Sequence, residues 1–325
     1  MTSQASQLLQ LLVGRSFLHK PQNIDWIALH PLALSNAIAP WLYAEYNDLM
    51  SAAASELYRK DFIVCNLNRE LLIAEAKRLE AQFPNQLVRI KGAALDSLIY
   101  SKPGQRVFYD IDLLVEKKTF DSVSQYLVAD GFKKHLQSEW SGTLNRTNYT
   151  KHYSQNCEIN FDLHQRLFWG VDASVDWEIE YDSQGQFRRL AHADHFFYLV
   201  VNWIYQDTFV GLYKLLDLIL FWRTFSDQFS LERLVKLIKI HNLDRTFNLA
   251  LQLMQKWGKV DTQKLSSQLD HTSNWIVDTL SEDFLVQPQS QRAKYFLLKH
   301  LTKPNIIKAL RYDLGWMNAQ IRNFF

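Results

Sequence analysis

Cysteine is scarce in this sequence, with only Cys65 and Cys157 among 325 residues. Two distant thiols form neither a disulfide framework nor a cysteine-based zinc site, so both classes of protein are excluded. A surplus of charge of one sign is also lacking, because 36 basic residues face 34 acidic ones and leave a net charge of +2. So small an excess is not typical of a protein that binds long nucleic acid.

Long uninterrupted hydrophobic runs are absent as well. The most apolar stretch, residues 196–222, contains polar side chains and is divided by Gly211, which predicts two buried helices rather than a membrane span. The first residues, Met1 to Gln4, lack the basic and apolar regions of a signal peptide. We therefore expect a globular, cytoplasmic protein, because 47% hydrophobic and 22% charged residues are typical of a folded chain.

The distribution of apolar residues predicts three regions. Residues 1–84 and 191–325 carry apolar side chains at helical spacing, with a last helix expected over residues 292–325. Between them, residues 85–190 alternate β-like segments with helices, a pattern typical of a compact unit with a sheet. We predict an α+β fold, with a core of a small mixed sheet and helices at 85–190. An N-terminal helical region at 1–84 and a C-terminal helical domain at 191–325 would flank it.

Two aspartates stand in the most β-like segment of this core, residues 107–115. Asp110 and Asp112 are separated by one residue, so on a strand both side chains project from the same face. Two carboxylates among apolar neighbours repel each other and are costly to bury, and a divalent cation relieves both problems. The pair predicts a Mg²⁺ site, and two solvated acids at the end of a strand are the alternative.

A third acid lies in a segment of strict alternation, residues 157–164. The pattern predicts a strand with apolar side chains on one face and Asp162 and His164 on the other. Asp162 becomes a third carboxylate of the site if this strand lies beside the first. A sheet with one solvated face explains the alternation equally well. For His164, a contact at the site and a structural hydrogen bond are the two alternatives.

Residues suited to phosphate binding precede the aspartates. Lys91, Gly92 and Ala93 lie between a predicted strand and a predicted helix. Glycine allows close approach of the backbone there, and the start of a helix offers free N–H groups. Arg106 adds a guanidinium fork that matches phosphate oxygens. A turn glycine and a surface arginine paired with a carboxylate are the structural alternatives.

Together these motifs resemble the polymerase-β-type nucleotidyltransferase superfamily, and within it a bacterial branch of uncharacterised nucleotidyltransferases. The resemblance covers residues 55–225 and is carried by the following segments: Ile90 to Leu95, Arg106 to Val115, Gly131-Phe132 and Ile159 to His164. The superfamily usually has Gly-Ser or Gly-Gly where this sequence has Gly92-Ala93. The segment around Lys214 and Asp217 resembles a downstream helix of the same branch.

The resemblance implies an enzyme that transfers a nucleoside monophosphate from a nucleoside triphosphate to an acceptor and releases pyrophosphate. It implies that Asp110, Asp112 and Asp162 are catalytic and hold Mg²⁺, with Mn²⁺ as an alternative. Asp162 would act as general base or as a metal ligand. The implied nucleotide-binding residues are Lys91, Gly92, Ala93, Arg106 and Lys214. For Lys214 the alternative is an ion pair with Asp217.

The expected donor is ATP by default, and the transferred group is then AMP. The acceptor is expected to be a small molecule, a peptide or a protein, and the near-neutral charge makes nucleic acid the least favoured class. One alternative function is a non-catalytic, nucleotidyltransferase-like binding or antitoxin-type module. Another is a glycosyltransferase in which Asp-x-Asp holds a nucleotide sugar, but the helical pattern of residues 1–84 leaves no room for its upstream nucleotide-binding region.

Overall fold

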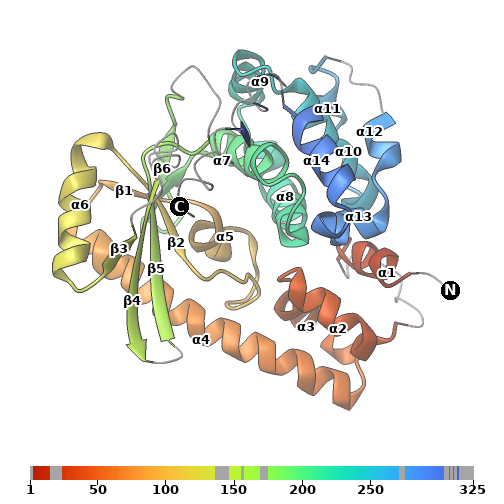
Figure 1. Ribbon diagram of the computed structural model, residues 1–325, viewed down its shortest axis with the longest axis horizontal. Helices are drawn as coiled ribbons and strands as arrows, with labels where there is room; N and C mark the ends of the chain where they lie inside the picture. Colours follow the sequence, from red (N-terminus) through yellow and green to blue (C-terminus); the bar gives the residue numbers. More distant parts are fainter. Residues whose placement is uncertain are drawn as a thin grey trace. The chain divides into compact units, whose positions relative to one another are not determined.

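The fold combines one mixed sheet with many helices. The computed structural model describes residues 3–14, 24–135, 146–154, 157–168, 175–270 and 275–303, with the single positions 307, 310, 313 and 314. A seven-stranded sheet occupies the middle of the chain, and helices precede and follow it (Figure 1). This confirms the predicted fold class. The helix expected over 292–325 begins at Arg292, and most of its part beyond 303 lies outside the described residues.

The chain forms two compact units, and each is assembled from several segments. The helical unit comprises Met1–Asn66, Ile99–Val107 and His192–Pro304, and the sheet unit comprises Leu67–Leu98, Phe108–Ala191 and Asn305–Phe325. Helix α4 (Ala52–Gln82) contributes residues to both. The division of the sequence at residues 84 and 190 stays a prediction about its domains.

In the sheet unit the strands follow the order β3-β4-β5-β2-β1-β7-β6. β5 pairs in parallel with β2, and β7 with β1, whereas the other neighbours are antiparallel. Figure 1 shows β4, β5 and β2 side by side. The strands are β1 Leu87–Arg89, β2 Ile111–Val115, β3 Lys133–His135, β4 Arg146–Ser154, β5 Cys157–His164, β6 Ile179–Tyr181 and β7 Arg188–Leu190. The sequence patterns did not predict β6 or β7, which are three residues long each.

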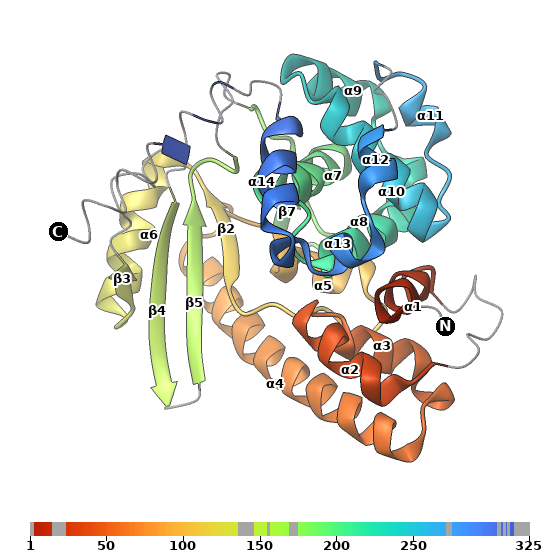
Figure 2. The same ribbon diagram turned by 45° about the vertical axis from the view of Figure 1, so that its right-hand side comes forward.

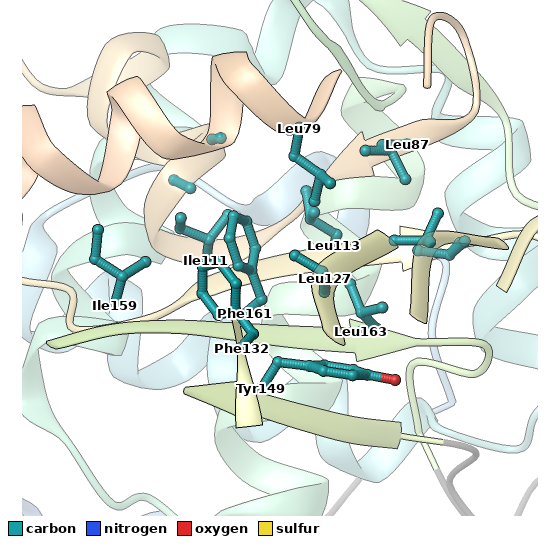
Figure 3. Packing of buried hydrophobic residues seen from close by; sticks show 14 of the residues in the cluster. Leu79, Leu87, Ile111, Leu113, Leu127, Phe132, Tyr149, Ile159, Phe161 and Leu163 are labelled. Carbon is teal, nitrogen blue, oxygen red and sulfur yellow. The ribbon is translucent and has the colours of Figure 1, made fainter. Parts of the chain in front are cut away.

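One face of the sheet carries the core of this unit. Leu79 of α4 and Leu127 of α6 (Lys117–Ala129) belong to the same buried cluster as Ile111, Leu113 and Phe161 of the central strands (Figure 3). Ile111, Leu113 and Val115 of β2 and Ile159, Phe161 and Leu163 of β5 therefore point into the core. Because side chains alternate along a strand, the even-numbered ones point to the opposite face, where the candidate site lies.

The helical unit is built from short helices that pack on one another (Figure 2). Gly211, with φ of +87°, separates α7 and a π-helical turn from α8, as the interrupted apolar stretch predicted. Among the described residues, no helix combines the length and hydrophobicity that crossing a membrane requires. Apart from α4, the helical unit contains the following described elements: α1 Gln4–Leu11, α2 Trp26–Ser35, α3 Ala39–Tyr46, η1 Asn47–Leu49, α7 His192–Val200, η3 Val201–Gln206, α8 Leu212–Phe225, η4 Ser226–Gln228, α9 Leu231–Ile240, α10 Asp244–Gly258, α11 Gln263–Ser266, α12 Trp275–Thr279, α13 Glu282–Val286, η5 Pro288–Ser290 and α14 Arg292–Leu301.

Candidate functional site

Parallel pairing of β2 with β5 places two aspartates side by side. The register aligns Asp112 with Asp162 and Ile111 with Phe161. Neighbouring strands lie about 4.8 Å apart, so side chains at aligned positions of one face are in reach of each other. Ile111 and Phe161 enter the core, and both carboxylates therefore project from the other face.

This face is not solvated at the site. The exposed fractions are 3% for Asp112, 0% for Asp162 and 4% for His164. A solvated sheet face is therefore wrong for Asp162 and His164, and a solvated acid is wrong for Asp112, although Glu158 at the start of β5 is exposed. Buried carboxylates require compensation by cations or hydrogen bonds.

Two basic side chains neutralise the buried carboxylates. The Nζ of Lys91 lies 2.5 Å from Oδ1 of Asp112, and the guanidinium of Arg146 forms an ion pair with Asp162. Nε2 of His164 is 2.9 Å from the same Oδ1 of Asp112 and 3.6 Å from Oδ2 of Asp162. The arrangement is thus a pair of acids held between a lysine, an arginine and an imidazole.

Lys91 reaches Asp112 because of the antiparallel pairing of β1 with β2. The N–H of Ile90 donates to the carbonyl oxygen of Asp112 at 3.1 Å. Lys91, the next residue, therefore leaves the sheet beside Asp112. Lys91 has a φ of +50°, unusual for a residue with a side chain, and it is the first residue of α5 (Lys91–Ile99). The turn from strand to helix thereby aims the ammonium group at the carboxylates.

The charges of the site oppose each other in their effects on pKa. Burial alone would raise the pKa of Asp112, but the Lys91 ammonium and the hydrogen bond with His164 outweigh it and hold that pKa well below its usual range. Burial lowers the pKa of His164, and the charge of Lys91 adds to this effect against the hydrogen bond with Asp112. Asp112 is therefore a carboxylate and His164 a neutral imidazole at neutral pH.

Asp110 differs from the other two aspartates. The pattern of residues 107–115 predicted that Asp110 lies on the strand. This is wrong, because β2 begins at Ile111 and Asp110 lies in the bend before it. The negative charge of Asp112, together with burial, raises the pKa of Asp110 from 3.8 to about 7. Without a bound cation, Asp110 is therefore protonated in a substantial fraction of molecules at neutral pH.

Gly92 and Ala93, which follow Lys91 in the first turn of α5, are buried against other residues and not directed at the carboxylates. A Cβ atom on Gly92 would lie only 2.5 Å from Cβ of Phe108, so close packing alone requires glycine here. Ala93 is buried and belongs to the core cluster. Only the backbone of these two residues is available to a ligand, which is the part that a phosphate cradle at a helix N-terminus uses.

Replacing Gly92 with alanine is expected to lower the free energy of unfolding by about 1–3 kcal/mol, because Phe108 has to move to admit the new methyl group. Urea denaturation of the purified protein measures this loss. Ser97→Ala, at an exposed position of the same helix, is the matched control and should change stability little. A Gly92→Ala protein as stable as the parent would contradict the packing argument.

Arg106 and Lys214 belong to the helical unit and have other partners. The Nε and Nη2 atoms of Arg106 donate to the two carboxylate oxygens of Asp217 at 2.8 and 2.9 Å, and the hydroxyl of Tyr100 donates to Asp217 at 2.6 Å. Lys214 pairs with Asp207, not with Asp217. Nucleotide contacts by Arg106 and Lys214 stay predictions, and the ion pair with Asp217 already occupies the guanidinium fork of Arg106.

Sequence reasoning overlooked Arg146, the first residue of β4. Its place at the site depends on the antiparallel pairing of β4 with β5, which aligns Arg146 with His164. A single basic residue at a strand start carries no pattern of its own, so only the pairing reveals it. His164 was considered as a contact or a structural residue, and the structure places it directly against Asp112.

The donor set fits a divalent cation. Among the described residues, Asp112, Asp162 and His164 form a group whose ligand atoms all lie within 4.8 Å of one another. Oδ1 of Asp162 is buried and accepts no hydrogen bond from any described residue. An uncompensated buried carboxylate oxygen is costly, and a cation beside it would remove that cost. These side chains could therefore hold a metal ion, with Asp110 adjacent but outside the group.

A comparison with protein families indicates what kind of protein carries this site. The model of a family described as uncharacterised nucleotidyltransferase matches residues 22–259. The chain belongs to this family. Membership confirms the resemblance drawn from the sequence motifs and supports a general role in nucleotidyl transfer, with a nucleoside triphosphate as the implied substrate. The matched span contains Asp110, Asp112 and Asp162 of the candidate site, together with Lys91, Arg146 and His164. No curated protein and no solved structure gives a significant match.

Proposed function

We propose that this nucleotidyltransferase transfers the AMP group of ATP to a small-molecule, peptide or protein acceptor in a Mg²⁺-dependent reaction that releases pyrophosphate. The observation that carries the proposal is the aligned, buried pair Asp112 and Asp162, which contacts Lys91, Arg146 and His164. So many charged groups on one buried face are costly for stability, and a ligand of high charge explains their presence.

Asp110, Asp112 and Asp162 would hold Mg²⁺, and Mn²⁺ is the alternative ion. When bound, the ion neutralises phosphate charge and favours the ionised form of the attacking oxygen. Carboxylate oxygens are preferred ligands of both ions. His164 stands close enough to serve as a ligand or to orient Asp112 through its hydrogen bond.

Protein groups would bind the triphosphate and handle the proton of the acceptor. The first turn of α5 would bind the triphosphate through backbone N–H groups of Gly92 and Ala93. Lys91, now paired with Asp112, would turn to a phosphate oxygen once another cation compensates that aspartate. The acceptor oxygen attacks the α-phosphorus, the bond from this phosphorus to the bridging oxygen breaks, and Asp162 takes the acceptor proton or orients the acceptor.

The test uses ATP labelled at the α-phosphate or, separately, at the γ-phosphate, incubated with the protein, Mg²⁺ and a cell extract. We expect label from the α-phosphate in a product and label from the γ-phosphate in pyrophosphate, with both lost when EDTA is added. The mass of the labelled product identifies the acceptor class. Transfer from a nucleotide sugar would favour the glycosyltransferase, and absence of Mg²⁺-dependent triphosphate binding in calorimetry would favour a non-catalytic module.

Lys214→Ala tests the proposed nucleotide contact of Lys214. If Lys214 binds a phosphate, its loss should weaken the affinity for ATP about tenfold, since one charge-assisted hydrogen bond contributes about 1.5 kcal/mol. The Asp207→Asn variant removes the present partner of Lys214 and serves as control, because it keeps the ammonium group. Unchanged ATP affinity and turnover in Lys214→Ala would remove this residue from the site.

A further inference from the structure

A small pocket opens in the sheet unit beside the candidate site. Its volume is about 180 Å³, and it is lined by α4, by the start of β5 and by Tyr109, the residue that precedes Asp110. None of the residues assigned to metal or phosphate lines it. The pocket is therefore separate from the proposed triphosphate position.

The strand order places this pocket on one particular side of the aspartates. β2 lies between β1, which leads into α5, and β5, which carries Asp162. Phosphates bound at the start of α5 occupy the β1 side, so the acceptor has to approach from the β5 side. Asn160 lines the pocket and stands two residues before Asp162 on the same face of β5. Leu72 and Ile159, which also line it, belong to the core cluster on the α4 side of the sheet, so the pocket reaches from that side to the start of β5, two residues from Asp162.

The size and walls of the pocket limit what it can hold. An apolar cavity of about 150 Å³ accepts one benzene molecule, so this pocket has room for a single ring. Leu71, Leu72 and Ile159 supply apolar walls, and Tyr109, 67% exposed, presents an aromatic ring on which another ring can pack. A flexible polar chain would gain little from such walls.

Glu158 is the one charged side chain among the lining residues, beside the amides of Asn68 and Asn160 and the hydroxyl of Tyr109. Glu158 contributes a carboxylate, which accepts a hydrogen bond from Nδ2 of Asn160 at 3.0 Å. The Asn68 side chain, from α4, also lines the pocket and forms no hydrogen bond with any described residue. A ligand group with hydrogen-bond donors or a positive charge complements this set, and an anionic group does not.

We propose that this pocket binds the non-reacting part of the acceptor, and that this part is a single, mainly apolar ring bearing an amine. The inference rests on the proposed function, because it assigns the acceptor to the β5 side of a nucleotidyl-transfer site. It narrows the acceptor to small cyclic amines or to compounds that present such a group.

The test measures binding of benzylamine, with benzoate as the anionic counterpart, by ligand-observed NMR in the presence of Mg²⁺ and ATP. Leu71→Trp fills the pocket from a position that is 47% exposed, and Leu67→Trp, one turn earlier and 60% exposed, adds the same side chain outside it. We expect benzylamine to bind the parent protein. Leu71→Trp should weaken this binding about tenfold and Leu67→Trp should not, while Glu158→Gln should lower the preference for benzylamine over benzoate about threefold.

Two outcomes overturn the inference: no binding of benzylamine to the parent protein, or equal binding by the parent and Leu71→Trp. Calorimetry of Mg²⁺-ATP binding to the same samples separates this failure from that of the proposed function. If ATP binds and benzylamine does not, only the pocket assignment is wrong. If ATP does not bind to any of these proteins, the proposed function itself fails.

Discussion

Nucleotidyl transfer is expected to fall by about a thousandfold or more when Asp110 and Asp112 are both replaced with asparagine. Asparagine keeps the shape of each side chain and removes both negative charges. Asp162 alone cannot hold a divalent cation against the triphosphate, and the charge of the reacting phosphates would stay uncompensated. Transfer of label from the α-phosphate of ATP, measured at saturating Mg²⁺, reports the loss.

The same double variant should remain folded. Asp112 is buried, but asparagine can still accept hydrogen bonds from Lys91 and His164 through its side-chain oxygen. Circular dichroism and thermal unfolding check the fold, and Asp121→Asn on the exposed side of α6 is the matched control with one charge removed. If the folded double variant keeps the activity of the parent, these aspartates are not the metal ligands and the proposed mechanism is wrong.

The second large effect concerns stability without metal. A rise in the pKa of Asp110 from 3.8 to about 7 means that folding becomes less favourable as pH rises between these values, because the unfolded chain releases this proton earlier. Well below pH 3.8 the group is protonated in both states and has no effect, and well above pH 7 the full loss of about 4 kcal/mol is reached. Asp110→Asn should therefore be more stable than the parent protein at pH 8, and nearly equally stable at pH 4.

Urea denaturation in EDTA at several pH values measures this difference. Comparing the variant with the parent cancels the titration of other groups, including the buried His164. Added Mg²⁺ should make the difference at pH 8 smaller, because the parent, which has the additional carboxylate of Asp110, should bind the ion more tightly than the variant. A constant stability difference between the two proteins from pH 4 to pH 8 would show that Asp110 does not feel the charge of Asp112.

The parts of this structure that the sequence predicted are those with a local signature. Strict alternation over residues 157–164 predicted β5 and the face from which Asp162 and His164 project. The Asp-x-Asp spacing identified the two acids, but it could not predict that the strand begins only at Ile111 and therefore contains Asp112 and not Asp110. Periodicity reports which face a side chain occupies and not where a strand starts.

The parts that it did not predict depend on contacts between distant segments. The sequence could not identify the carboxylate that pairs with Arg106, because Asp217 stands 111 positions later in the chain. Arg146 joins the site only through the register of β4 against β5. Short strands such as β6 and β7 have too few residues to show a period, so they escape detection until their partners are known.

The parallel register of β2 and β5 also has a consequence for the order in which the protein folds. Asp112 and Asp162 are about fifty residues apart in the chain, so their alignment requires closure of a long loop, which is slow compared with the formation of α6 between them. The carboxylates therefore come together late, after the helices have formed. A divalent cation that binds the assembled carboxylates should therefore lower the unfolding rate of the protein rather than raise its folding rate.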